Sequence, residues 1–464
     1  MRNTIILIIC IIWSCFLHAQ ERQEILTFEE FLAFVKKNHP VAAQADLKLS
    51  EAEARVLEAR GGFDPKIDID YSTKEFKGTD YYDILYGSFK IPTWFGIELQ
   101  AGYELNDGEF LNPQNFVPED GLYSAGISVP VGQGLFINKR MASLSQAKIF
   151  RDLNTAEREL QINQLLFEAV LSYLDWYRAW REYELYGSFL ENAELRFRNL
   201  KREIEVGATA PIDSVELGIT VQNRRLNLQN SALTLLKARL NLSNFLWEEN
   251  LVPLEIAGFV RPQEEVTEAL NSFLLSNENL IDDFDITTHP KIRSLRSKIE
   301  TLEVERRLKA EMLKPELNLN YNFITSDAEQ LNTINSGDYK FGLQFSMPIF
   351  LRKERGALEL SKFKIQDAEF ETEQEALILR NKSEAALQQV TNYESQRDLV
   401  DRVAEDYERL LQAEERKFSF GESSVFLLNS REAKLLEARL KQIELEYKLG
   451  EAQAELIRTL ALPF

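Results

Sequence analysis

Cysteine and histidine, which most often supply nucleophiles and metal ligands, are almost absent from this chain of 464 residues. Both cysteines, Cys10 and Cys15, lie within the first 20 residues, and only His39 and His289 follow that segment. Without a later cysteine or a third histidine, the usual zinc sites cannot be assembled. Each histidine precedes a proline at an expected helix start, which is a structural position rather than that of a catalytic base. The sequence therefore predicts no catalytic residue, no metal and no cofactor, and the protein is not expected to be an enzyme.

Carboxylates are the one abundant reactive group. Asp and Glu number 74 against 54 Lys and Arg, which gives a formal charge of −20. Paired carboxylates could perform hydrolysis, but no pair stands out from the solvated faces of the expected helices. A paired-carboxylate hydrolase stays as a third alternative. No basic stretch interrupts the acidic helices, so a nucleic-acid partner is not expected.

The chain begins as a secretory signal peptide. Met1 and Arg2 precede an apolar run, Ile5–Leu17, and then Ala19. This run is too short to span a bilayer. Cleavage after Ala19 removes residues 1–19 and leaves a mature chain without cysteine; lipid attachment at Cys15 is the alternative. After residue 20 no apolar run approaches the ~20 residues of a membrane helix, so entry into a membrane would require strands.

Proline placement divides the chain into helical and turn-rich blocks. All 13 prolines lie outside residues 131–210 and 349–462. These windows predict long helices over 137–205 and 353–417, each a rod of roughly 100 Å. Shorter returning helices are expected over 213–247 and 424–460.

Apolar residues in these helices recur at coiled-coil spacing, so each rod is expected to pack on its returning helix. In the first rod the heptad positions are Leu153, Leu160, Phe167 and Leu174. The returning helices carry Leu226, Leu233, Leu240 and Trp247 in one case and Leu436, Leu440, Ile443 and Tyr447 in the other. An ordinary soluble helical bundle would explain these seams equally well.

The chain is duplicated. The pair His39-Pro40 returns as His289-Pro290, and Pro65 returns as Pro315 at the same offset. Pro130 and Pro348 each close a strand and precede a long helix, while Gly207 and Gly421 stand where each rod must turn back. We therefore expect a first repeat over 20–250, an inter-repeat equatorial segment over 251–287 and a second repeat over 288–464.

Strands with alternating polarity lie between the paired prolines, within residues 66–130 and 316–347. Four strands are well supported, and residues 83–91 and 95–105 form a possible extra pair. Apolar-out and polar-in alternation is typical of a barrel that encloses water, although a soluble sheet packed on helices gives the same pattern. Four to six strands cannot close the smallest membrane barrel, which has eight, and an open edge in lipid is not tolerated. Membrane strands would therefore require several chains.

With these features the chain resembles the TolC family of outer-membrane efflux and type I secretion channels over the expected mature length. The resemblance rests on the segment from Leu26 to Pro40, in which Thr27 and Glu30 form a capping box, on Pro65, Pro315, Pro130 and Pro348 at the helix–strand transitions, and on the tip glycines Gly207 and Gly421. It implies a homotrimer with a twelve-stranded β-barrel and a long α-helical coiled-coil barrel in the periplasm. The implied partners are a periplasmic adaptor protein, an inner-membrane transporter and outer-membrane lipid.

The same resemblance places a gate at the periplasmic tip. An acidic residue often lies six positions after the tip glycine, and the first repeat has Asp213 there, whereas the second has Leu427. Phe418 and Ser423 stand where some relatives have a bonding tyrosine and arginine. Glu422 could form an acidic ring, or be a solvated turn residue, and Asp213 could be only the N-cap of its helix.

Residues 82–120 depart from the family pattern of one hairpin per repeat. They could add a hairpin, giving 18 strands per trimer, but the expectation here is an external loop or partial plug. The predicted function is an outer-membrane channel for efflux or type I secretion; the alternative is a periplasmic coiled-coil scaffold or adaptor without a barrel.

Overall fold

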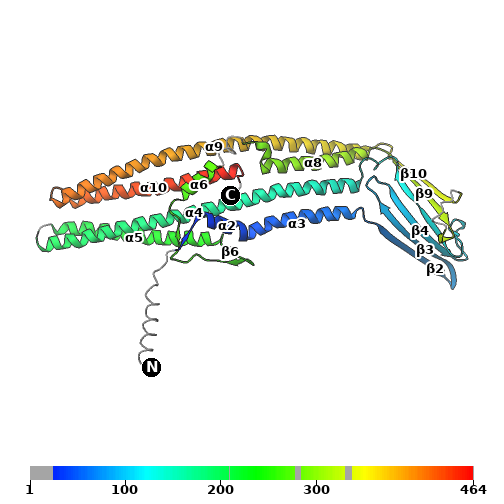
Figure 1. Cartoon of the computed structure of the whole chain (residues 1–464), viewed down its shortest axis with the longest axis horizontal. Helices are drawn as coiled ribbons and strands as arrows, with labels where there is room; N and C mark the ends of the chain where they lie inside the picture. The colour runs from blue at the N-terminus through cyan, green and yellow to red at the C-terminus, as the bar shows by residue number, and fades with distance from the viewer. Residues whose placement is uncertain (1–23, 208–209, 277–283, 330–336, 463–464) are drawn as a thin grey trace, which may run out of the picture. The chain divides into compact units, whose positions relative to one another are not determined.

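The computed structural model describes residues 24–207, 210–276, 284–329 and 337–462. The expected signal peptide and the possible lipid site at Cys15 lie outside these residues. The described chain is mainly helical and carries one curled sheet (Figure 1). It divides into two compact units, residues 1–46, 159–289 and 377–464 in the first and residues 47–158 and 290–376 in the second. Each unit takes elements from both sequence repeats, because their helices and strands pack side by side.

The two repeats contain matching helices. Helix α3 (Pro40–Gly61) and helix α8 (Pro290–Glu311) each have 22 residues. The long helices are α4 (Lys139–Glu205) and α9 (Arg352–Ser419), and the returning helices are α5 (Pro211–Ser243) and α10 (Val425–Thr459). Each tip glycine thus lies between a long helix and its returning helix.

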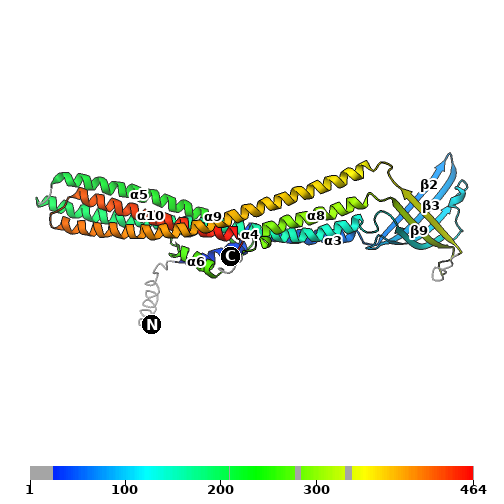
Figure 2. The same ribbon diagram turned by 90° about the horizontal axis from the view of Figure 1, so that it is seen from above.

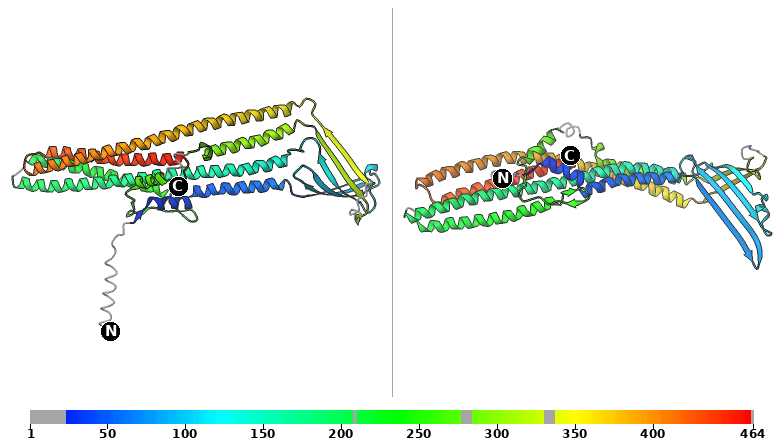
Figure 3. Two further views of the ribbon diagram at one scale, coloured as in Figure 1. Left: turned by 45° about the horizontal axis from the view of Figure 1, so that its top comes forward. Right: turned by 60° about the horizontal axis from the view of Figure 1, so that its bottom comes forward.

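The second unit contains a six-stranded antiparallel sheet, which Figure 3 shows to be curled. Its order is β10-β9-β5-β4-β3-β2. The bounds are β2 Lys66–Phe76, β3 Thr79–Pro92, β4 Glu98–Asp107, β5 Leu122–Pro130, β9 Glu316–Thr325 and β10 Tyr339–Ser346. The first repeat therefore supplies four consecutive strands and the second repeat two.

Strands β3 and β4 correct the expectation of a loop or plug over residues 82–120. The pair is fully hydrogen-bonded into the sheet: Phe89 of β3 lies opposite Ile67 of β2 and Ala101 of β4. Alternating apolar and polar residues suit a half-buried strand, and this local preference outweighs the family pattern of one hairpin. The remaining part of the segment contains a short 3₁₀ helix, Pro113–Asn115.

The first unit is a bundle in which α9 lies beside α10 and α4 beside α5 (Figures 1 and 2). Helix α2 (Phe28–Asn38) begins at Thr27, whose side chain and that of Glu30 form the predicted capping box. A parallel pair of short strands, β1 (Ile25–Leu26) and β8 (Arg261–Pro262), joins the residues before α2 to the segment between the repeats. That segment also contains β7 (Val252–Pro253), which pairs with β6 (Trp247–Glu248), and α6 (Val266–Ser276).

The main core lies at the middle of α4. Tyr173, Leu174 and Trp176 are fully buried and pack with residues of α2, α6 and α10. The Tyr173 hydroxyl donates to the Leu26 carbonyl at 2.6 Å and accepts from the Gln263 amide at 3.0 Å. This part of α4 is therefore buried on more than the narrow stripe of a coiled-coil seam. Among the described helices, none is both long enough and apolar enough to cross a membrane.

Candidate functional site

The hydrogen-bonded register of the sheet brings apolar side chains of all six strands onto one face. Residues directly opposite each other in antiparallel strands lie on the same face. One row across the sheet is Ile67, Phe89, Ala101, Ala125, Phe323 and Tyr339, and a second is Ile91, Leu99, Ile127, Tyr321 and Phe341. The sequence shows alternation within each strand, but only the register shows that the strands combine into one apolar face.

This apolar face is uncovered within the described chain. Ile67 is 73% exposed, Phe341 57% and Phe345 64%. Soluble monomers rarely expose a contiguous apolar patch of more than a few hundred Å². Aromatic pairs lie toward both ends of the strands: Trp94 stacks on Phe63 near the helices, and Tyr81 contacts Phe76 and Phe110 at the opposite end. An apolar band between aromatic girdles is the pattern of a membrane-embedded sheet.

The opposite face of the sheet is polar and carries charges of both signs. The Lys90 ammonium lies 3.3 Å from the Asp68 carboxylate. Gln100 Nε2 donates to Asn322 Oδ1 at 2.7 Å and thereby joins strands from the two repeats. The mixture of amides and paired charges suits a face in contact with water.

The four prolines mark the junction of strands and helices. Pro65 and Pro315 immediately precede β2 and β9, Pro130 is the last residue of β5, and Pro348 lies between β10 and α9. The Gln133 amide donates to the Pro315 carbonyl at 2.8 Å. The chain that leaves the sheet in the first repeat is thus tied to the chain that enters it in the second.

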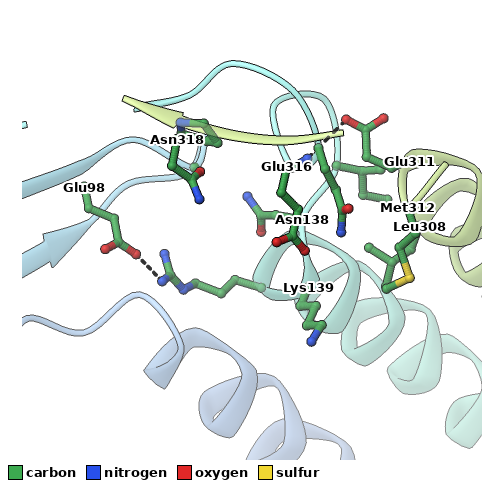
Figure 4. A pocket seen from close by; sticks show the side chains of 14 residues that line it. Glu98, Asn138, Lys139, Leu308, Glu311, Met312, Glu316 and Asn318 are labelled. Atoms are coloured by element: carbon green, nitrogen blue, oxygen red, sulfur yellow. Dashed lines mark hydrogen bonds and ion pairs between the residues drawn. The ribbon is translucent and has the colours of Figure 1, made fainter. Parts of the chain in front are cut away.

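A cavity of about 430 Å³ lies at this junction (Figure 4). Glu98 forms an ion pair with Arg140, and Glu311 accepts from the Gly134 amide at 3.3 Å and pairs with Lys314 at 2.7 Å. Three carboxylates line the cavity, and two of them, those of Glu98 and Glu311, are thus paired with cations. The Glu98–Arg140 ion pair joins the start of α4 to the base of the sheet. Among the described residues, no cluster of three or more His, Cys, Asp or Glu side chains could hold a metal.

The tip turns have the geometry that glycine favours. Gly207 and Gly421 adopt φ angles of +74° and +75°, which other residues reach only with strain. In the second repeat the Gly421 amide donates to the Phe418 carbonyl at 3.0 Å. The partly buried Phe418 ring packs on the buried Leu200, Leu217 and Val425, so the two tips share one small core.

The predicted gate residues differ between the tips. Asp213 is not the N-cap of α5; that position is Ala210, and Asp213 lies in the first turn, where the helix dipole favours a carboxylate. Ser423 Oγ donates to Glu414 Oε1 at 2.5 Å, a bond across the second turn. Glu422 is exposed, and Leu427, which replaces the acidic residue in the second repeat, is 43% exposed.

A buried ionic cluster close to the tip was missed from the sequence. Glu432 of α10 pairs with Arg196 of α4, and Arg224 of α5 supplies a second nearby positive charge. Burial raises the pKa of Glu432 while the two guanidinium groups oppose the shift. The spacing of Arg224 could have indicated its burial, because it follows Leu217 and Val221 at the intervals of four and three that place residues on one buried helix face.

The two histidines are structural, as their place before a proline indicates. His39 Nδ1 accepts from the Val41 amide at 3.1 Å, and its ring stacks on Phe245. His289 is 4% exposed, and burial lowers its pKa to about 4. Both side chains lie at the boundary between a preceding segment and the next helix.

Two helices of the first unit, α5 and α9, carry exposed apolar stripes. The stripe on α5 shows that the seam predicted for this helix against α4 was wrong. Leu226, Leu233 and Leu240 of α5 are 57%, 52% and 50% exposed, so they do not pack on α4 as expected. Instead α5 buries Leu217, Val221 and Leu242. The α9 residues Leu387, Leu399, Val403 and Leu410 are likewise exposed. By contrast, Leu436 and Ile443 of the α10 seam are buried as predicted.

Comparison with known proteins gives a consistent result. Residues 286–462 match the family described as "Outer membrane efflux protein". The fold is similar to the CmeC outer-membrane channel of Campylobacter jejuni, with a TM-score of 0.63, 14% identity, and coverage of 93% of this chain and 85% of that chain. The outer membrane protein VceC of Vibrio cholerae gives a TM-score of 0.64 at 12% identity, with coverage of 93% of this chain and 95% of VceC. The open state of the MtrE outer-membrane channel of Neisseria gonorrhoeae gives a TM-score of 0.62 at 13% identity, with coverage of 93% of this chain and 88% of MtrE. A search of curated proteins finds no match.

Proposed function

We propose that three copies of this chain, whose residues 286–462 match the outer membrane efflux protein family, assemble into a channel that conducts solutes from the periplasm across the outer membrane. The observation that carries this proposal is the continuous apolar face of the six-stranded sheet, with its polar opposite face. Such a sheet fits a wall that separates lipid from water.

The exposed stripes on the helices support assembly of several copies. Leu226 and Leu233 of α5 and Leu399 and Leu410 of α9 lie on different helices of the first unit. A neighbouring copy would bury the α5 stripe against the α9 stripe, and repetition of this head-to-tail contact closes a ring. Each of these leucines is about half exposed, so its burial would contribute about half of the ~1.5–3 kcal/mol gained by a fully exposed leucine.

The helical tip is the proposed meeting point with a periplasmic adaptor and an inner-membrane transporter. Gly207 and Gly421 expose their turns, and Val206, Phe420 and Phe426 place apolar side chains in solvent beside them. Asp213 and Glu422 are the proposed acidic residues of the gate, and Phe418 and Ser423 hold the second turn. For export by this route, the chain would lie in the outer membrane after removal of residues 1–19, with its helices in the periplasm.

Reconstitution in planar lipid bilayers tests the channel. The detergent-solubilised protein is expected to run as a trimer in light scattering and to give discrete single-channel conductance steps. A monomer that leaves the bilayer silent would contradict the proposal. Carbonate washing of membranes adds a second criterion, since a periplasmic scaffold or adaptor would be released whereas a membrane-embedded sheet stays in the pellet.

A further inference from the structure

The outer strands of the sheet each have one free hydrogen-bonding edge within the described residues. Strand β2 pairs with β3, and β10 pairs with β9, without a second partner. This inference rests on the proposed function, in which these edges would lie in lipid. Unpaired backbone groups are too costly to persist there. Something must therefore cover them, and a second copy of the chain offers both missing edges.

The direction of the strands fits such a partner. Every neighbouring pair from β2 to β10 is antiparallel. Because the sheet has six strands, β2 and β10 run in opposite directions. The β2 strand of a neighbouring copy can then extend the sheet beyond β10 with the same alternation, whereas an odd number of strands would force a parallel pair at each seam.

The register shows a stagger across the sheet. The row that starts at Ile67, close to the helical end of β2, ends at Tyr339, which is the first residue of β10 and lies remote from the helices. A level sheet would instead bring Ile67 into line with the last residues of β10. Closure of a barrel requires tilted strands with a cumulative stagger of this kind.

We propose that β2 pairs with β10 of the neighbouring copy, with Ile67 opposite Phe345, so that a trimer forms an 18-stranded barrel in which β3 and β4 are part of the wall. This register keeps Ile67 and Phe345 on the apolar face and sets Asp68 opposite Gln344 on the polar face. Tyr339 then lies opposite Thr73, an advance of six positions along β2 over six strands.

The tilt that follows is in the range of known membrane barrels. With a rise of about 3.3 Å per residue and a strand spacing of about 4.8 Å, this stagger inclines the strands by about 35°, and membrane barrels have tilts of ~35–45°. A register two residues shorter gives about 25°, outside that range. Eighteen strands place opposite backbones roughly 35 Å apart, compared with roughly 24 Å for twelve.

Disulfide cross-linking in outer membranes tests the seam. We expect the double variant Asp68→Cys/Gln344→Cys to form dimers and trimers that disappear on reduction. The matched control is Asp68→Cys/Asn318→Cys, because Asn318 is the direct neighbour of Gln344 on β9 and lies one strand farther from the seam. That separation exceeds disulfide reach, so no product is expected. Single-cysteine variants give the background.

A second measurement reports the width of the barrel without cysteine. Neutral polymers are added to the extracellular side of reconstituted wild-type channels, and those small enough to enter the barrel lower its conductance. An 18-stranded wall is expected to admit polymers about 1.5-fold wider than a twelve-stranded wall, in proportion to strand number. A cut-off equal to that of a twelve-stranded channel would overturn the proposal.

The outcomes separate the seam from the channel itself. Conducting trimers in which neither Asp68 nor its neighbours Lys66 and Asp70 cross-link to Gln344 would overturn the 18-stranded wall and leave the channel assignment intact. Dominant cross-linking from Lys66→Cys or Asp70→Cys would overturn the register. Absence of both trimers and conductance would reject the proposed function together with the seam.

Discussion

The two repeats share helix lengths but differ in the number of their strands, in their returning helices and in the charge at their tips. The first repeat supplies four strands, an exposed stripe on α5 and Asp213 at its tip; the second supplies two strands, a buried seam on α10 and Leu427. Helices α3 and α8 have the same length of 22 residues. Duplication has thus kept the framework while the contact surfaces diverged, so equivalent positions are expected to respond differently to the same kind of change.

The largest difference is expected eleven residues after each tip glycine, where the second repeat has Glu432 and the first has Gly218. Glu432→Gln leaves the buried Arg224 and the partly buried Arg196 without their countercharge, and removal of one partner from a buried pair costs about 3–5 kcal/mol. Gly218→Ala should instead stabilise the helix by about 0.5–1 kcal/mol, because the added Cβ would lie 3.7 Å from Phe197. Thermal unfolding followed by circular dichroism compares the two midpoints. Equal shifts of the same sign would show that the cluster is not important.

The returning helices provide the second comparison. Leu436→Ala in the buried α10 seam should cost about 2–5 kcal/mol of chain stability. The triple replacement of Leu226, Leu233 and Leu240 by Ala on α5 should change the stability of one chain by less than about 0.5 kcal/mol per site but weaken the trimer. Light scattering across a dilution series measures assembly. A triple variant that stays fully trimeric would remove α5 from the subunit interface.

The histidines give a smaller effect that depends on pH. The pKa of His289 falls from 6.5 to about 4 on folding, so between these values the unfolded chain binds more protons than the folded chain. Stability should therefore be complete above pH 6.5 and decline as the pH falls toward 4. His289→Gln should flatten this decline. His39→Gln is the matched control, because the more exposed His39 has a lowered pKa with opposing contributions from Asn244 and Glu168. Identical pH profiles for both variants would contradict this assignment.

The smallest effect is expected at the tip charges. Asp213→Asn removes an acidic group from the first turn of α5, and Leu427→Asp adds one at the equivalent place in the second repeat. Cation preference, measured as the reversal potential in a salt gradient, should decrease in the first variant and increase in the second. Screening of exposed charges limits each change to a few-fold in permeability. Unchanged selectivity in both would place the constriction elsewhere.

The sequence by itself determined the duplication, the helices and the helix–strand transitions. Prolines lack an amide donor and glycines tolerate positive φ. Pro65 and Pro315 therefore mark where a helix gives way to a strand, and Gly207 and Gly421 mark where a long helix turns back, without tertiary context. Heptad spacing also showed that α5 needs an apolar partner. It could not show which partner, because a seam against the same chain and a seam against a neighbouring copy have the same period.

Only the tertiary structure decided how the strands and charges meet. Strands β3 and β4 join the sheet through backbone hydrogen bonds, which carry no residue signature, and the shared apolar face depends on register between segments as distant as Ile127 and Tyr321. The cluster of Arg196, Arg224 and Glu432 likewise draws on three helices. Local patterns follow from one residue and its close neighbours, whereas these arrangements require pairings between distant parts of the chain.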